Sequence, residues 1–371
     1  MYKAFGIVNP SGRRIWVDGL EDYRPIGAFS FMGRYRIIDF PISNLNNSGI
    51  DRIQIYLGAN PRSLADHLGT GRQYNINSKR GNLQILYSTN TNEHNSYNTD
   101  IATYAENMEF IEGMHNPYVV IVPTYMVYTM DYSELITAHV ESGADVSLLY
   151  HSVDTADTKY LACNTLTLNK QKGVTSITPN NGAHKNRHIF MDTYVMKTKL
   201  FKELVRKAQK ISSMYTLADI INDECTEGDV RGYAHHGYFA SITDFESYYE
   251  ANMSLINYDC ARDLFHSDWP IYTRTNDSCP TQYCVNADVK NSIVSNGCHI
   301  EGTIENSIIG RGVTIKKGAT VRNSIVLADA IISEDTLIEN QVIDKRARIL
   351  KTKEIVSPAD KPGYIRRADT V

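Results

Sequence analysis

The sequence predicts an α/β domain built on a mostly parallel sheet, followed by a three-sided parallel β-helix. Three observations predict it. Short β-branched runs alternate with helical patterns over roughly the first two-thirds of the chain, a six-residue apolar repeat follows, and 371 residues are too many for one comfortable core. We therefore expect an α/β domain over residues 1–268, a linker over 269–284, and a β-helix domain with a C-terminal tail over 285–371.

The alternating part of the chain predicts a sheet covered by helices on both faces. Strands are expected at Ala4–Val8, Arg52–Tyr56, Tyr118–Val122 and Asp145–Tyr150, and helices at Ile101–Glu112 and Tyr132–Ser142. Ligands of such folds bind beyond the carboxyl ends of the strands, so the loops after Val8 and Val122 are where chemistry is expected.

The last third of the chain repeats a short unit. VKNSIV at 289–294 recurs as IENSII at 304–309, VRNSIV at 321–326 and IENQVI at 338–343. Apolar residues also recur every six positions, at Val313, Ala319, Ile325, Ile331, Leu337, Ile343 and Ile349. This period fits neither a helix nor an alternating strand, but it fits a β-helix in which each unit forms one face and these residues stack inside. Pro270 and Pro280 mark the linker before it.

Net charge and apolar segments indicate which partners the chain could bind and where it is located. A net charge of −4 gives no basic footprint for nucleic acid or an anionic membrane, although a local cluster of Arg and Lys could still bind a phosphorylated small molecule. The N-terminus has too short an apolar run for a signal peptide, and the most apolar stretch, Tyr118–Tyr128, is about half a membrane span. We expect a cytoplasmic protein.

The cysteines and histidines suggest no metal site. The six cysteines are scattered, and no Cys or His pair follows Cys279 and Cys284 at zinc spacing, so reduced, unpaired thiols are expected. His299 lies in the β-helix, and acyltransferases built on hexapeptide coils need a catalytic histidine. Acyl transfer is not favoured, because the sequence upstream of the β-helix resembles a different class of enzyme.

The segment GRYRIIDFPISNLNNSGI at 33–50 closely resembles the corresponding stretch of ADP-glucose pyrophosphorylases, also called glucose-1-phosphate adenylyltransferases. Further matches follow in order: SLADHL (63–68), YTMDY (128–132), HVESGADV (139–146) and SYYEANMSLI (247–256). The resemblance covers nearly the whole chain. It implies a nucleotidyltransferase-type, Rossmann-like and GT-A-like sheet, followed by a left-handed β-helix.

The family's phosphate loop is altered here. The pattern L-A-G-G-x-G-T-R-L aligns with IVNPSGRRI at 7–15, in which Gly12 and Arg14 match but Asn9 and Pro10 replace the paired glycines. Proline has no N–H and a fixed φ, so it cannot donate a hydrogen bond to a phosphate. The resemblance therefore implies a disabled loop.

The family's two metal carboxylates are absent from the aligned positions, where Tyr125 and Ser241 stand instead. A phenol is neutral at pH 7 and a poor magnesium ligand. The expectation is a pocket without acidic side chains that binds no metal. Asp244 is a displaced ligand in one interpretation and the cap of the following helix in the other.

The sugar-binding motifs are also altered, because the family's G-T-A-D-A aligns with TDIAT at 99–103 and its E-K-P with Ile177, Thr178 and Pro179. Two family lysines are replaced by Arg24 and Arg34. These guanidinium groups keep their charge and either contact an anion or effector or form structural ion pairs.

The resulting prediction is a regulatory, catalytically degenerate subunit, inactive or very weak alone, that modulates a catalytic homologue making ADP-glucose from ATP and glucose 1-phosphate. Magnesium is expected in that partner, the assembly is expected to be a hetero-tetramer, and a phosphorylated effector could bind Arg14, Arg24 or Arg34. Two alternatives stay open: an active sugar-phosphate nucleotidyltransferase with relocated ligands at Asp100 and Asp244, and a stand-alone sugar-phosphate sensor.

Overall fold

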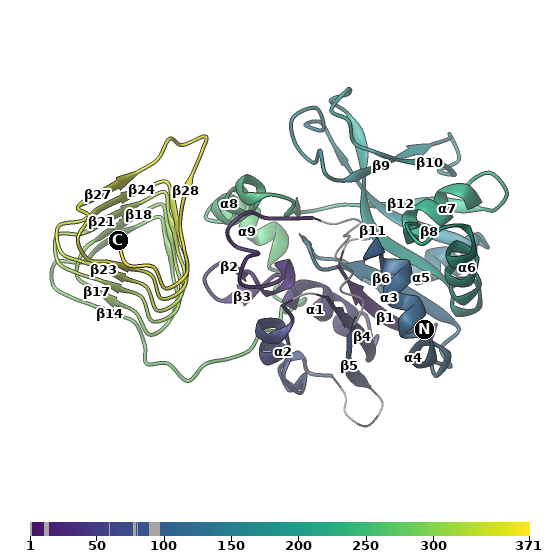
Figure 1. The fold of residues 1–371 in the computed structure, drawn as a ribbon, viewed down its shortest axis with the longest axis horizontal. Helices are drawn as coiled ribbons and strands as arrows, with labels where there is room; N and C mark the ends of the chain where they lie inside the picture. Colours follow the sequence, from purple (N-terminus) through teal and green to yellow (C-terminus); the bar gives the residue numbers. More distant parts are fainter. Residues whose placement is uncertain (1, 11–14, 59, 77–78, 80, 89–96) are drawn as a thin grey trace. The chain divides into compact units, whose positions relative to one another are not determined.

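The computed structural model describes the chain except residues 1, 11–14, 59, 77–78, 80 and 89–96 (Figure 1). The chain divides into two compact units. The first comprises Met1–Trp16, Ile38–Thr243 and Ser267–Tyr272, and the second comprises Val17–Ile37, Asp244–His266 and Thr273–Val371. The β-helix thus shares its unit with two segments that precede it in the chain.

The first unit contains a nine-stranded sheet with the central strand order β10-β9-β11-β6-β1-β4-β5, and β8 joins β11 to β12. The pairings β1–β4, β1–β6, β4–β5 and β8–β12 are parallel, whereas β11 runs antiparallel to its neighbours. Its strands are β1 (Ala4–Asn9), β4 (Arg52–Leu57), β5 (Asn82–Tyr87), β6 (Tyr118–Pro123), β8 (Val146–Val153), β9 (Asn164–Leu168), β10 (Val174–Pro179), β11 (Arg187–Lys197) and β12 (Val230–His235). This confirms the predicted mostly parallel sheet, and each predicted strand is present.

Helices flank this sheet (Figure 1). They are α1 (Asp39–Asn47), α2 (Arg62–Leu68), α3 (Asp100–Glu106), α4 (Met108–Glu112), α5 (Tyr132–Ser142), α6 (Thr198–Ile211) and α7 (Leu217–Glu224), with the 3-10 turn η2 (Arg72–Tyr74). Side chains of β1, β6, β8 and β11 form one buried apolar core with those of α3, α6 and α7. Within the described ranges, no helix is long and apolar enough to cross a membrane.

One predicted helix differs from the observed structure. Residues 101–112 were expected to form a single helix, but the structure breaks it into α3 and α4 at Asn107. The Asn107 side chain donates a hydrogen bond to the carbonyl of Thr103, at 3.0 Å. Asparagine competes in this way with helical backbone bonding, which explains the break. The other predicted helix, α5, has the expected bounds.

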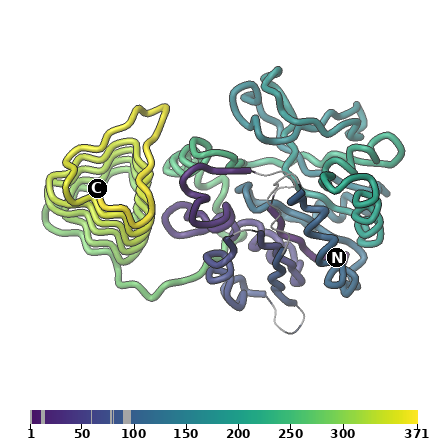
Figure 2. The backbone as a smooth tube through the Cα atoms, viewed as in Figure 1, coloured from purple at the N-terminus to yellow at the C-terminus, as the bar shows by residue number. Residues whose placement is uncertain are grey.

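The β-helix consists of three five-stranded parallel sheets, ordered β14-β17-β20-β23-β26, β15-β18-β21-β24-β27 and β16-β19-β22-β25-β28. Its stacked, three-sided coils are visible in Figure 2. The strands are β14 (Gln282–Tyr283), β15 (Asp288–Lys290), β16 (Ile293–Val294), β17 (His299–Ile300), β18 (Thr303–Glu305), β19 (Ile308–Ile309), β20 (Thr314–Ile315), β21 (Thr320–Arg322), β22 (Ile325–Val326), β23 (Ile331–Ile332), β24 (Leu337–Glu339), β25 (Gln341–Ile343), β26 (Arg348–Ile349), β27 (Glu354–Val356) and β28 (Gly363–Ile365). The predicted left-handed hexapeptide β-helix is confirmed.

The repeated Asn-Ser pair has a physical cause in the corners of this β-helix. Asn291, Asn306 and Asn323 adopt positive φ angles of 43°, 46° and 44°, a conformation that asparagine tolerates better than most residues. Their amides form a ladder, since Asn291 donates to Asn306 at 3.0 Å and Asn306 donates to Asn323 at 2.7 Å. The motif therefore satisfies both the turn and the contact between coils.

The strict six-residue apolar period is wrong at three positions. Ile325, Ile331 and Leu337 were expected inside the β-helix, but its core contains Val326, Ile332 and Ile338 instead. Ile325 is buried outside that core, and Ile331 and Leu337 are only half-buried. The reason is the register: Thr314 pairs with Ile331 and Thr320 with Leu337. A coil there advances 17 residues (331 − 314) rather than eighteen, which shifts the inward position by one.

Two segments outside the repeat pack within the second unit. Val17–Ile37 contains η1 (Ile26–Ala28), β2 (Ser30–Phe31) and β3 (Tyr35–Arg36), and the other segment contains α8 (Phe245–Ser254) and α9 (Tyr258–Leu264). Tyr248 of α8 donates to the carbonyl of Ser30 at 2.7 Å, and Asn252 accepts from the Met32 N–H at 2.9 Å. Gly33 has a φ of 68°, and a Cβ there would lie 2.7 Å from Ser295 Oγ. A glycine is therefore required where this hairpin contacts the β-helix.

Candidate functional site

The first candidate site lies where β1 and β6 end side by side. Asn9 pairs with Pro123, and its carbonyl accepts a hydrogen bond from the Thr124 N–H at 3.0 Å. The Asn9 side chain is buried and hydrogen-bonds the Tyr104 hydroxyl, whereas Pro10 is exposed. Gly12 and Arg14 lie outside the described residues. Asn9 therefore takes part in the internal packing of the sheet.

The structure brings Tyr125 and Ser241, which the resemblance aligns with the family's metal carboxylates, next to each other. The short strands β7 (Met126–Tyr128) and β13 (Phe239–Ser241) pair so that Ser241 lies opposite Met126, and the Ile242 N–H donates to the Tyr125 carbonyl at 2.9 Å. Both side chains are buried. Ser241 Oγ lies 3.2 Å from Cys163 Sγ, and the Tyr125 hydroxyl donates to Asp192 Oδ2 at 2.5 Å. The two side chains thus contact protein neighbours, Cys163 and Asp192.

Asp192 is an acidic residue that sequence reasoning missed. It lies at an irregularity of β11 between Phe190 and Tyr194 and has a φ of 43°. The expectation of a pocket without acidic side chains is therefore wrong at this position, because the bent strand directs a carboxylate to Tyr125. One signal could have revealed it: an aspartate interrupts the apolar run IFMDTYVM at 189–196, where a buried strand is otherwise uninterrupted.

Asp100, one of the two proposed relocated ligands, lies buried at the start of α3. Its Oδ1 accepts hydrogen bonds from the N–H groups of Ile101 and Leu217, at 2.8 and 3.0 Å. Burial raises the pKa of its carboxyl to about 7, and the nearby charges of Asp192 and Asp219 add to this effect. Asp100 therefore joins the starts of α3 and α7.

Asp244, the other proposed ligand, belongs to the second unit and caps α8. Its Oδ1 accepts from the Ser247 N–H at 2.7 Å, and the Ser247 hydroxyl accepts from the Asp244 N–H at 3.0 Å, which is a reciprocal capping box. Of the two interpretations of Asp244, the structure shows the helix cap.

Tyr125 and Ser241 themselves offer magnesium no carboxylate. Magnesium demands octahedral oxygen coordination, normally with one or two carboxylates and substrate phosphates. Asp192 supplies a single carboxylate, and it already accepts the Tyr125 hydroxyl. Within the part of the chain that the structure describes, three His, Cys, Asp or Glu side chains come within ligand distance of one another only at Cys284, His299 and Glu301, in the β-helix.

Arg24 lies in the second unit as a buried ion pair. Its guanidinium contacts the Asp344 carboxylate, which also accepts a hydrogen bond from the Tyr364 hydroxyl at 2.7 Å. Arg24 is 3% exposed and Asp344 is fully buried. The structure therefore places Arg24 in a structural ion pair between the segment Val17–Ile37 and a late coil of the β-helix.

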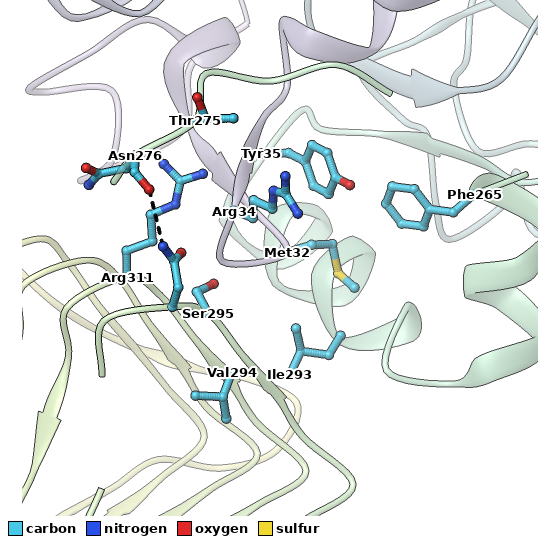
Figure 3. Close-up of a pocket in the computed structure, with 11 residues that line it drawn as sticks. Met32, Arg34, Tyr35, Phe265, Thr275, Asn276, Ile293, Val294, Ser295 and Arg311 are labelled. Atoms are coloured by element: carbon cyan, nitrogen blue, oxygen red, sulfur yellow. Dashed lines mark hydrogen bonds between the residues drawn. The ribbon is translucent and has the colours of Figure 1, made fainter. Parts of the chain in front are cut away.

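Arg34 instead lines an open hollow of about 430 Å³ within the second unit (Figure 3). Arg311 contributes a second guanidinium from the β-helix and donates to the carbonyl of Arg274 at 3.2 Å. The described lining contains no Asp or Glu; it consists of Met32, Arg34, Tyr35, Phe265, Thr275, Asn276, Ile293, Val294, Ser295, Asn296 and Arg311. Two cations beside apolar and amide groups suit a small anionic ligand.

Known protein families match both parts of the chain. The nucleotidyl transferase family matches residues 11–257, and the GlmU-like C-terminal hexapeptide family matches residues 280–361. The first match covers more than half of the chain, and the second coincides with the β-helix.

Individual relatives match over most of their length. The glycogen biosynthesis protein GlgD of Bacillus subtilis is 30% identical over 98% of this chain and 96% of its own length. A glucose-1-phosphate adenylyltransferase of Fervidobacterium nodosum is 30% identical over 86% of this chain and 77% of its own, and GlgD of Geobacillus stearothermophilus is 29% identical over 85% and 82%. The chain therefore belongs to the nucleotidyl transferase family and, within it, to the bacterial glucose-1-phosphate adenylyltransferase family that includes the GlgD-type proteins.

Proposed function

We propose that this chain is a catalytically degenerate, regulatory subunit of glucose-1-phosphate adenylyltransferase in glycogen biosynthesis. The observation that carries the proposal is the pair Tyr125 and Ser241. They occupy adjacent positions at the ends of the short strands where the family places its metal carboxylates, and both are buried and hydrogen-bonded to protein neighbours.

The chemistry explains why this replacement matters. Nucleotidyl transfer builds negative charge on phosphate oxygens, and a metal ion held by carboxylates neutralises it. Losing one group that stabilises the transition state commonly lowers the rate about 10²- to 10³-fold, although such losses are not additive within one site. Pro10 adds a further loss, because it cannot donate an N–H to a phosphate. The chain alone is expected to turn over negligibly.

Regulation requires a partner, and we propose a catalytic homologue in a hetero-tetramer. Magnesium then belongs to the partner's site. The regular β-helix, with its continuous core of stacked aliphatic side chains, supports a role in assembly. This chain would change the partner's affinity or rate by favouring one of the partner's conformations.

The hollow beside Arg34 and Arg311 supports the proposal that a phosphorylated effector binds this chain and controls its regulatory role. The guanidinium groups of Arg34 and Arg311 can neutralise the charge of an anion in this hollow. Arg24 is not available for this role, because it is buried and already paired with Asp344. The same hollow also favours the second candidate function, a sugar-phosphate sensor that works without a partner.

The test is an assay of ADP-glucose formation from ATP, glucose 1-phosphate and magnesium. The chain alone is expected to be inactive, and adding it to the catalytic homologue of the same organism is expected to change the rate or the apparent substrate affinity. If the mixture behaves as the catalytic homologue alone at every ratio, the regulatory proposal fails. Thermal stabilisation of the isolated chain by sugar phosphates would then favour the sensor.

A further inference from the structure

Three side chains with metal-binding chemistry meet on one face of the β-helix. Cys284 follows β14, His299 begins β17, and Glu301 follows β17. Because Gln282 pairs with His299 and Tyr283 with Ile300, residues 15 to 17 positions apart become neighbours across adjacent coils. The Cys284 N–H, for instance, donates to the Ile300 carbonyl at 2.8 Å. All three side chains are half-buried.

The distances between the ligand atoms suit a tetrahedral ion. His299 Nε2 lies 3.7 Å from Cys284 Sγ and 3.0 Å from Glu301 Oε1, and all three atoms lie within 4.8 Å of one another. Zinc bond lengths and a tetrahedral angle give S···N and N···O separations of about 3.6 and about 3.3 Å. Small side-chain shifts would therefore complete the coordination.

Hydrogen bonds outside the cluster orient these ligands. His299 Nδ1 lies 3.2 Å from Gln282 Oε1, so an Nδ1–H can donate to this amide oxygen while Nε2 faces the thiol and the carboxylate.

Glu301 is held in a similar way. Its Oε2 accepts from the Lys317 N–H at 3.2 Å, which leaves Oε1 directed at His299. An oriented histidine and an oriented carboxylate are the usual surroundings of a protein metal site.

We propose that Cys284, His299 and Glu301 bind a divalent ion of the zinc class. A thiolate with an imidazole and one carboxylate favours zinc over magnesium or calcium, and three protein ligands leave a fourth position for water. Binding releases the thiol proton to solvent. Because β14 is the edge strand of its sheet, the ion would fasten the first coil to the second.

The test uses the full chain, stripped with a chelator and kept reduced by a phosphine, in millimolar magnesium to occupy oxygen-only sites. Cobalt(II) is the probe, because a thiolate ligand gives it a near-ultraviolet charge-transfer band. One equivalent is expected to produce the band, and zinc is expected to abolish it by displacement. Zinc is also expected to raise the thermal unfolding midpoint.

The variants separate this site from other thiols. Cys284→Ser is expected to lose the band and His299→Gln to weaken cobalt binding at least about tenfold, while Gln282→Ala weakens it about 10- to 100-fold. Cys279→Ser, which removes an exposed thiol five residues earlier, is the matched control and keeps the band. Far-ultraviolet circular dichroism verifies that each variant folds.

Two results would overturn the proposal. The first is the absence of a cobalt band and of zinc stabilisation in the reduced wild type. The second is binding that survives in Cys284→Ser and His299→Gln, since it would place the ion elsewhere.

Discussion

The end of the central sheet and the β-helix differ in how their side chains are used. At the sheet, Tyr125 and Ser241, which we propose replace the family's metal carboxylates, are buried and hydrogen-bonded within the fold. In the β-helix, the Asn-Ser unit recurs with its turns and side-chain ladder maintained. On this proposal a reaction centre is replaced while its packing is kept, whereas each coil of a stacked repeat depends on its neighbours.

The largest expected effect is a difference in stability between substitutions on the inward and the outward face of β23. Ile332→Asp places a charge in the core and should cost about 4 kcal/mol or more, which unfolds the second unit. Ile331→Asp changes the half-buried neighbour and is the matched control. Denaturant unfolding followed by circular dichroism measures both. Equal losses would contradict the observed register.

A smaller effect on the free energy of unfolding is expected at Asp100, at the start of α3, and it depends on pH. Folding raises the Asp100 pKa from 3.8 to about 7, so the folded state binds the proton more tightly than the unfolded state. The stability due to this group is present below about pH 4 and is lost as the pH rises to about 7. Between pH 5 and 8 the wild type should lose on the order of 2 kcal/mol more than Asp100→Asn. Parallel pH profiles for the two proteins would contradict this account.

The Tyr125–Asp192 hydrogen bond should contribute about 1–2 kcal/mol, because its partners are a hydroxyl and a carboxylate in a buried strand end. The measurement is a double-mutant cycle with Tyr125→Phe, Asp192→Asn and the double variant. A coupling energy near zero would show that the two side chains do not interact in solution.

The smallest expected effect lies at a β-helix corner. Asn323→Ala places alanine at a φ of 44° and removes the amide that accepts from Asn306, which should cost about 1 kcal/mol. Asn323→Gly removes the same amide without the backbone strain and is the control. If the two variants are equally stable, strain at this corner is not a significant factor.

Local patterns predicted most of the fold. The four strands and α5 follow from periodicity, which depends on neighbouring residues. The break at Asn107 and the 17-residue coil step were missed, because a side-chain hydrogen bond and the register between coils determine them.

The sites were harder to predict. Tyr125 and Ser241 were identified by resemblance, and β7–β13 pairing brings them together. Asp192 was missed because it reaches Tyr125 through a bend in β11. Cys284 and His299 become neighbours only through coil stacking, which no local spacing rule detects.

The most direct test of the central claim uses a hetero-oligomer whose catalytic subunit has both metal carboxylates changed to amides. Neither subunit then offers a working site, and we predict no ADP-glucose above the blank at saturating ATP, glucose 1-phosphate and magnesium. Magnesium-dependent ADP-glucose formation that disappears with Asp100→Asn in this chain would contradict the account.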